Sequence, residues 1–423
     1  MFILFFRDGG YMKRLWQNLA KCIGLALCVT LICFNSGEQM SYVRSLPDSV
    51  SDDQLEYICR NLKGPLSLSM GGGDTYASEN LSETLFEKNG SASICLFGAI
   101  PIKTIEYGER QDITVMPGGM PIGVSIYTDG ALVVGLGSIS ETEQICPAAS
   151  AGIRAGDVIT AVDGESVQDS VHLSELCSKG GELTVTVRRD GKLLSVVLVP
   201  VKSTENDVYR AGMWVRDSTS GIGTLSFCNM FSRRYGALGH PITDIDTGSI
   251  IDVGSGSIVE SSIIGVSAGS NGIPGEVIGS FSMASRRLGS IELNCEYGLY
   301  GEMDEIPVNP IYPNGVKLAY PDEVHTGKAE ILSTVDDRGV CAYECEVIKL
   351  YPQKEIGGKG MVIRITDREL IAKTGGIVQG MSGSPVMQDG KLIGAVTHVF
   401  VNDAKCGYCI YSWWMNSVCD KIQ

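Results

Sequence analysis

Short apolar runs alternate with polar and small residues over most of the chain after residue 100. Gly-Gly and Asp-Gly turns interrupt these runs in residues 101–140, and similar punctuation continues from residue 208 to the C-terminus. Alternation with a period of two, bounded by such turns, predicts β-strands and hairpins. A helical period stands out in residues 167–177 and 411–422. Many short strands over roughly 200 C-terminal residues predict a mainly β protein with a barrel or a pair of barrels.

The N-terminus follows a different pattern. Lys13, Arg14 and Lys21 precede an apolar stretch from Cys22 to Phe34. This stretch is shorter than the ~20 residues that a free helix needs to span a bilayer. A basic region followed by a short apolar core predicts a secretory signal peptide or an uncleaved membrane anchor over residues 1–35, with a buried core helix as the alternative. We therefore expect the protein to leave the cytoplasm.

Composition narrows the class of protein. Hydrophobic residues make up 44% of the 423 residues, which is enough for folded domains with sizeable cores. The formal net charge of −15 argues against general nucleic-acid binding, because such proteins use lysine and arginine to neutralise phosphates. Residues 36–99 are polar and irregular, and we expect a spacer there with little regular structure.

The cysteines give only weak signals. The chain has 14 of them, and three lie in the apolar N-terminal segment, which leaves an odd number and therefore at least one unpaired or intermolecularly bonded thiol. Cys341 and Cys345 are closely spaced, and so are Cys406 and Cys409, which leaves zinc binding as an alternative. We expect no metal ion and no other cofactor, and we interpret most of these cysteines as small core residues or as members of adventitious disulfides.

Residues 100–202 carry a more specific pattern. The stretch SAGIRAGDVITAVDGESV (residues 150–167) is followed by the amphipathic segment 167–177 and by a hairpin that turns at residues 189–191. This order resembles a PDZ domain of the bacterial protease type. The resemblance implies that a peptide adds a strand to the sheet, with its terminal carboxylate at a loop formed here by Ile122, Gly123 and Val124. A PDZ fold that only packs against its neighbour is the alternative.

The sequence VQGMSGSPVMQDGKLIGAVTH (residues 378–398) contains a candidate nucleophile. A serine nucleophile needs a base to accept its proton and donors to hold the oxyanion. Glycines on either side of the Met381-Ser382 pair permit unusual backbone angles, so the N–H groups of Gly380 and Ser382 are positioned to form an oxyanion hole. The loop resembles the nucleophile loop of chymotrypsin-like serine peptidases, from which it departs at Met381 and Ser384. A plain Gly/Ser/Pro hairpin is the alternative.

The chain has four histidines, and one of them is the expected base. We favour His240, because a base that precedes the serine by a long interval approaches from the other half of a double barrel. His398, on the strand after the serine, is the competitor. The orienting carboxylate is open among Asp367, Asp244 and Asp246, because the sequence does not show which carboxylate is near the distal nitrogen of the histidine.

These features together resemble the stage IV sporulation protein B family, the signalling serine peptidases of endospore-forming bacteria. The resemblance rests on the PDZ-like unit, on GALGHPITDIDTG (residues 236–248) and on VQGMSGSPVMQDGKLIGAVTHVFVND (residues 378–403). It implies a chymotrypsin-like double β-barrel peptidase domain over residues 203–423. It also implies a catalytic triad of His240, Asp367 and Ser382.

The resemblance further implies a biological role. A serine endopeptidase of this kind is exported across the forespore membrane into the intermembrane space, where it is at first membrane-associated through its N-terminal segment. It cleaves itself and then a membrane-bound regulator of an intramembrane protease, which activates a late sigma factor. The PDZ domain would bind peptide termini, and no nucleic acid is expected as a partner. The alternative is a non-catalytic envelope binding protein that has kept the PDZ domain and the barrel without their activity.

Overall fold

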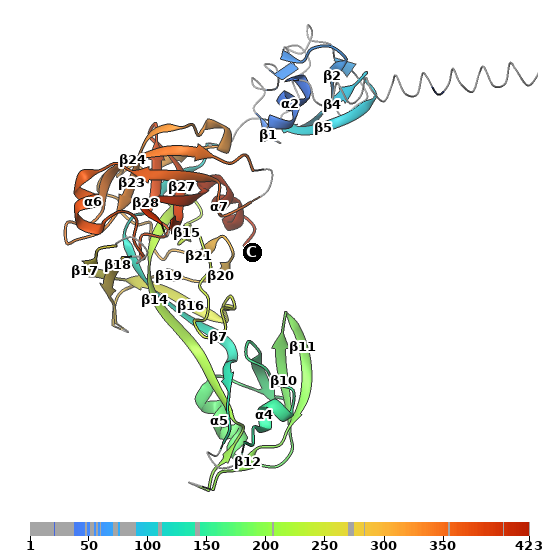
Figure 1. Cartoon of the computed structure of the whole chain (residues 1–423), viewed down its shortest axis with the longest axis vertical. Helices are drawn as coiled ribbons and strands as arrows, with labels where there is room; N and C mark the ends of the chain where they lie inside the picture. Colours follow the sequence, from blue (N-terminus) through green and yellow to red (C-terminus); the bar gives the residue numbers. More distant parts are fainter. Residues whose placement is uncertain are drawn as a thin grey trace, which may run out of the picture. The chain divides into compact units, whose positions relative to one another are not determined.

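The computed structural model describes residues 112–139, 144–204, 207–269, 275–282, 284–353, 356–400 and 402–422. Before residue 112 it describes residues 21, 38–46, 49–50, 55, 58–59, 61–70, 75–76 and 90–108. The chain divides into two compact units, Met1–Gln111 and Asp112–Gln423 (Figure 1). Among the described helices, none is both long and apolar enough to cross a membrane. The signal peptide or anchor expected over residues 1–35 lies outside the described residues, apart from residue 21.

The N-terminal unit contains a small sheet, which corrects the expectation of an irregular spacer over residues 36–99. Leu68, Ile94 and Ile105 are fully buried in its core. Serines separate the apolar residues of these strands and give the sequence a loop-like polarity, but they occupy the opposite face of the sheet. The strand order is β1-β5-β4-β2-β3. The elements are α2 (Glu38–Ser45), β1 (Ser49–Val50), β2 (Leu66–Met70), β3 (Thr75–Tyr76), β4 (Gly90–Leu96) and β5 (Ile100–Tyr107).

The second unit begins with a closed β-barrel. Strand pairing runs from β7 to β14, β15 and β21; a bridge between Gly289 and Met303 then leads to β19, which pairs with β16, and β16 returns to β7. Ile122, Leu225 and Tyr235 are among its buried residues. The strands of this region are β6 (Thr114–Pro117), β7 (Pro121–Leu136), β14 (Met213–Asn229), β15 (Arg234–Ala237), β16 (Ser255–Glu260), β17 (Ser262–Ser267), β18 (Glu276–Ser280), β19 (Arg287–Ser290), β20 (Leu293–Cys295) and β21 (Gly298–Glu302). Of these, β17 and β18 pair with each other in a separate two-stranded sheet.

A second closed barrel follows. Its pairing runs from β23 to β24, β25, β28, β27 and β26, and β26 returns to β23. Phe227 and Tyr300 of the first barrel share a buried cluster with Leu332 and Met415, so the two barrels pack against each other. The expected mainly β fold with a pair of barrels is thereby confirmed. The elements are β22 (Val316–Leu318), η1 (Pro321–Glu323), β23 (Gly327–Ser333), β24 (Cys341–Leu350), β25 (Met361–Ile365), α6 (Arg368–Thr374), β26 (Pro385–Gln388), β27 (Lys391–Phe400), β28 (Asp403–Tyr411) and α7 (Ser412–Cys419).

A smaller domain is inserted in the first barrel between β7 and β14. Its core includes Ile159, Leu173 and Val185, contributed by two strands and a helix. The helix predicted over residues 167–177 is α5, whose N-terminus is capped by Asp169. The elements are α4 (Pro147–Ser150), β8 (Val158–Val162), β9 (Glu165–Ser166), α5 (Ser170–Ser178), β10 (Leu183–Arg189), β11 (Lys192–Leu198), β12 (Val201–Lys202) and β13 (Tyr209–Arg210).

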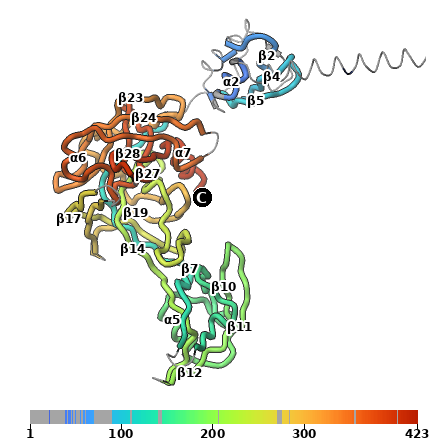
Figure 2. The backbone as a smooth tube through the Cα atoms, viewed as in Figure 1, coloured from blue at the N-terminus to red at the C-terminus, as the bar shows by residue number. Residues whose placement is uncertain are grey.

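Strands β7 and β14 belong to both the inserted domain and the first barrel. They pair with each other from Thr224 opposite Pro121 to Met213 opposite Leu136, and Figure 2 shows them running together from the barrel into the inserted domain. In the structure the junction between the two domains thus lies within β7 and β14, whereas the sequence interpretation placed a single boundary at residues 202–203. Residues 114–127 complete the barrel, whereas residues 208–216 complete the inserted domain.

Candidate active site

Ser382 and His240 line one pocket of about 490 Å³ between the two barrels. The first barrel contributes residues 219–223 of β14 and the loop after β15 that carries His240. The second barrel contributes residues 377–380, Ser382 and residues 397–399 of β27. The fold thus brings the expected nucleophile and the expected base to opposite walls of the same cavity.

Glycines determine the backbone conformation of the loop that carries Ser382 and its fit against the first barrel. Gly380 and Gly383 have φ angles of +92° and +94°, in the region that glycine alone adopts readily. A Cβ atom on Gly383 would lie 2.2 Å from the carbonyl oxygen of Thr224 and 2.6 Å from the amide nitrogen of Leu238. Both of these atoms belong to the backbone of the first barrel, so the loop fits against that barrel only with glycine at this position.

The two candidate oxyanion donors lie in the same loop. Among the described residues, the amides of Gly380 and Ser382 donate no hydrogen bond to another protein atom. The carbonyl oxygen of Gly380 accepts a hydrogen bond of 2.6 Å from the Thr224 hydroxyl, which is buried. This bond fixes the peptide plane that follows Gly380, so Thr224 is a member of the site that sequence reasoning missed. No motif in the sequence links it to the serine loop.

His240 is oriented by the backbone. Its Nδ1 lies 2.8 Å from the carbonyl oxygen of Pro241. Because a carbonyl oxygen can only accept a hydrogen bond, Nδ1 carries the proton and Nε2 has the free lone pair that a general base needs. The ring is partly buried in the pocket, and the turn that leads to it passes through Leu238 and Gly239, both with positive φ.

Ser382 and His240 share the pocket without a hydrogen bond between them in the described structure. The Ser382 hydroxyl instead donates to the carbonyl oxygen of Thr397, at 3.1 Å. Catalytic hydrogen bonds are often long or misaligned before substrate binds. A rotation about the Cα–Cβ bond of Ser382 would release the hydroxyl from Thr397.

His398, the competing base, lies in the same pocket. The centres of the His240 and His398 rings are 5.6 Å apart, with an angle of 47° between the ring planes. Burial lowers the pKa of His398, and the nearby His240 and Lys359 lower it further. His398 is therefore mostly neutral at neutral pH. The pocket holds both histidines that the sequence left as candidates.

The structure brings none of the three candidate carboxylates to the His240 ring. Asp367 caps helix α6, where its carboxylate accepts a hydrogen bond of 2.8 Å from the amide of Leu370, and it does not line the pocket. Asp244 and Asp246 bind Arg216. The acceptor at Nδ1 is the Pro241 carbonyl, a backbone group that sequence reasoning had no means to identify.

The loop expected to bind a peptide carboxylate is a strand of the first barrel. Ile122, Gly123 and Val124 pair with β14 on one side and with β16 on the other. A Cβ atom on Gly123 would lie 2.5 Å from the ring of Phe281. The interpretation of these three residues as a PDZ peptide site is therefore wrong, because their backbone groups face paired strands on both sides.

A groove of about 450 Å³ does exist in the inserted domain, between α5 and residues 208–215. Leu173, Ser174 and Cys177 of α5 form one wall. Residues 213–215 of β14 line the other, and within the described part of the chain they pair with β7 on one edge only. An unpaired strand edge beside a helix is the arrangement that accepts an added peptide strand.

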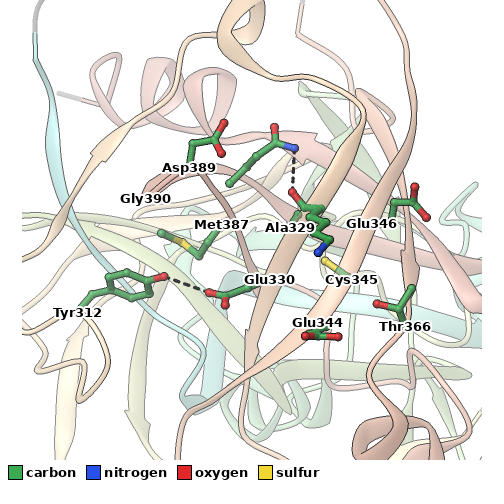
Figure 3. A pocket seen from close by; sticks show the side chains of 12 residues that line it. Tyr312, Ala329, Glu330, Glu344, Cys345, Glu346, Thr366, Met387, Asp389 and Gly390 are labelled. Carbon is green, nitrogen blue, oxygen red and sulfur yellow. Dashed lines mark hydrogen bonds between the residues drawn. The ribbon is translucent and has the colours of Figure 1, made fainter.

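A third cavity, of about 580 Å³, lies on the second barrel (Figure 3). Glu330, Glu344, Glu346 and Asp389 line it, and the Tyr312 hydroxyl donates to Glu330. Among the described residues, no group of three or more His, Cys, Asp or Glu side chains could hold a metal ion. The described cysteines, which include Cys341, Cys345, Cys406 and Cys409, are free thiols.

Comparison with protein families identifies a peptidase domain and a PDZ domain, with their junction between residues 199 and 207. Residues 207–416 match the family described as SpoIVB peptidase S55. Residues 120–199 match the PDZ domain. The first match contains both barrels' pocket residues His240 and Ser382, and the second contains most of the inserted domain.

Curated relatives and solved structures were also matched. Proteins from Brucella suis biovar 1 and Brucella abortus, each named as a probable periplasmic serine endoprotease DegP-like, are 31% identical to this chain over 157 residues. That region is 34% of this chain, and the chain spans only 30% of the length of these relatives.

The HtrA-type protease AlgW with decapeptide matches with 11% identity and a TM-score of 0.29, over 49% of this chain and 53% of its own. The active form of the Rv3671c protease from M. tuberculosis matches with 15% identity and a TM-score of 0.27, over 48% of this chain and 74% of its own.

Proposed function

We propose that this chain, a serine peptidase of the SpoIVB type with a PDZ domain, cleaves peptide bonds with Ser382 as nucleophile and His240 as base. One observation carries the assignment: the two side chains come from different barrels and line one pocket, in which the Met381-Ser382 pair lies between two glycines with positive φ and the amides of Gly380 and Ser382 are free to donate. In this proposal the Pro241 carbonyl holds the histidine tautomer.

The proposed chemistry uses only groups of this chain. Nε2 of His240 accepts the Ser382 proton as Oγ attacks the scissile carbonyl carbon. The amides of Gly380 and Ser382 hold the oxyanion that forms, and the Thr224 hydroxyl keeps the Gly380 peptide in place. His240 then protonates the leaving amine, and water hydrolyses the acyl-enzyme by the same steps in reverse.

The substrates are proteins, and we propose that the groove between α5 and residues 208–215 selects them or regulates their cleavage. A peptide terminus would add a strand along residues 213–215 and place its side chains against α5. The support for this role is the PDZ match together with the single free edge of β14 in the groove.

The proposed biological role is signalling during sporulation. In this proposal the chain is exported across the forespore membrane, is at first membrane-associated through residues 1–35, and acts in the intermembrane space. It cleaves itself and then a membrane-bound regulator of an intramembrane protease, which leads to activation of a late sigma factor. The support is the match of residues 207–416 to the SpoIVB peptidase family and the basic-then-apolar N-terminal sequence.

The nucleophile is tested by reacting the full-length protein with a fluorophosphonate and locating the label by peptide mass spectrometry. We expect one labelled serine, Ser382, and no label in Ser382→Ala. Ser384→Ala is the matched control, because Ser384 lies two positions away and is fully buried. Label on another serine, or equal label in a folded Ser382→Ala protein, contradicts the proposal and favours a non-catalytic binding protein.

A further inference from the structure

Strand β14 connects the PDZ groove to the active-site pocket. Residues 213–215 line the groove, and residues 219–223 line the pocket. Arg216 and Asp217 lie between these two segments. Their side chains hold two different parts of the protein, and neither residue was a candidate in the sequence.

Arg216 binds the loop that carries His240. Its guanidinium forms ion pairs with Asp244 and with Asp246, the second at 2.8 Å. The Asp244 side chain has no exposed surface, whereas that of Arg216 is 34% exposed. Burying a carboxylate is costly unless it is paired with a charge and hydrogen-bonded. Arg216 supplies the opposite charge.

Asp244 in turn determines the shape of the loop. Its other carboxylate oxygen accepts hydrogen bonds from the amide of Asp246 and from the amide and hydroxyl of Thr247, at 2.9–3.1 Å. Its backbone pairs with that of Ser249, which closes the loop on itself. Burial acts to raise the pKa of Asp244, but the Thr247 hydrogen bonds and the Arg216 charge outweigh it, so the pKa is lowered. The carboxylate is thus charged at neutral pH, and Arg216 carries the positive charge that pairs with it.

Asp217 anchors the same part of β14 from the other side. Its carboxylate accepts a hydrogen bond of 2.7 Å from the amide of Ser170, at the start of α5. Helix α5 forms one wall of the PDZ groove. The backbone next to Arg216 is therefore fixed to the inserted domain, which holds the guanidinium in place under the histidine loop.

We infer that Arg216 is a positioning residue for His240. It neutralises Asp244 and Asp246, and the loop that these two residues shape then presents the imidazole to Ser382. The inference rests on the proposed role of His240 as the base. The sequence left Asp244 and Asp246 as candidates for the carboxylate that orients the imidazole. In this inference they instead hold the loop and do not bind the imidazole nitrogen.

The test measures how fast a fluorophosphonate labels Ser382 in the full-length protein, as a function of probe concentration. We expect Arg216→Gln to lower the maximal labelling rate at least ~10-fold while the half-saturating probe concentration changes less than ~2-fold, because the imidazole promotes the attack and does not bind the probe. We expect the maximal labelling rate of Arg216→Lys to lie between those of the wild type and Arg216→Gln, because an ammonium group cannot pair with two carboxylates in the planar geometry of a guanidinium.

Two further variants separate positioning from general stability. Asp244→Asn, combined with Arg216→Gln, keeps an acceptor for the loop amides and removes the unpaired charge, so we expect it to restore the rate to within ~3-fold of wild type. Arg234→Gln breaks an ion pair of 2.9 Å with Glu292 in the same barrel, away from the pocket, and is expected to label at the wild-type rate.

The outcomes are distinct. A wild-type rate in folded Arg216→Gln, or a loss that only follows the fraction of unfolded protein seen by circular dichroism, overturns the inference. If Arg216→Gln does not fold, Arg216→Lys decides, and a wild-type rate in that variant overturns the inference. Failure of the wild-type protein to label at Ser382 rejects the proposed function, and the inference with it.

Discussion

The two loops that meet in the active-site pocket are held in place by different physical means. The serine loop fits by shape, because Gly383 packs against backbone atoms of Thr224 and Leu238 with no room for a Cβ atom. The histidine loop is held by charge, because Asp244 organises it and Arg216 neutralises Asp244. The first loop has a rigid position set by close packing. The second has a position that depends on an ion pair whose arginine lies next to the PDZ domain.

The largest effect on stability and labelling is expected from a substitution in the serine loop. Gly383→Ala places a Cβ atom 2.2 Å from a backbone oxygen at a φ of +94°, so we expect a loss of about 3 kcal/mol or more in the free energy of unfolding. We also expect no labelling of Ser382 by a fluorophosphonate. Chemical denaturation and labelling are measured on the same preparation.

Gly390→Ala is the matched control for this substitution. Gly390 also has a positive φ, of +75°, but a Cβ atom there would meet nothing within 4 Å. Its cost is therefore the backbone strain alone, about 1 kcal/mol, with labelling unchanged. Equal losses for the two glycines would show that close packing does not set the position of the serine loop.

The contact between the first barrel and the serine loop should give an intermediate effect. Thr224→Val keeps the shape of the buried side chain but leaves the Gly380 carbonyl without its hydrogen bond. We expect a loss of about 1 kcal/mol in stability. We expect the labelling rate to fall ~10-fold, less than for removal of an oxyanion donor itself, because the substitution loosens the loop that carries the Gly380 and Ser382 amides and deletes neither amide. Thr224→Ser, which retains the hydroxyl, should recover most of the rate, and failure to do so contradicts this role.

The smallest effect is expected at Asp367. Its carboxylate caps α6 and is not at the histidine, so Asp367→Asn, which still caps a helix, should label within ~2-fold of wild type. Asp367→Ala should lose about 1 kcal/mol of stability through the missing cap. A large loss of labelling in folded Asp367→Asn would restore Asp367 as the orienting carboxylate.

The same contrast explains which parts of the site could be predicted from the sequence. Steric requirements leave glycines in the sequence, so the loop around Ser382 was identifiable, and the serine and His240 are found in one pocket. A backbone carbonyl that orients a histidine has no signature in the sequence, because every residue has a carbonyl. For this reason the role of the Pro241 carbonyl at His240 Nδ1 could not be predicted. An ion pair between distant residues such as Arg216 and Asp244 is equally invisible without the pairing of β14.

Strand pairing also limited the prediction of domains. The alternation in residues 121–136 indicated strand structure interrupted by an Asp-Gly turn, whereas the structure has one continuous strand, β7. The pattern could not show that the first half of this strand pairs within a barrel and its second half within the PDZ domain. Residues 212–215 have the same glycine-then-apolar pattern as residues 119–122, and these are the residues that line the observed groove. Periodicity identifies a strand and not its pairing partner, so the peptide site was assigned to β7 and not to β14.

The most direct test of the central claim, a serine and a histidine acting across two barrels, compares the labelling rate of Ser382 in His240→Ala and His398→Ala. Both rings lie in the pocket, so each substitution removes a similar volume close to the serine. We predict that His240→Ala lowers the rate at least ~10³-fold and that His398→Ala stays within ~10-fold of wild type. The reverse order, or a wild-type rate in folded His240→Ala, would contradict the account.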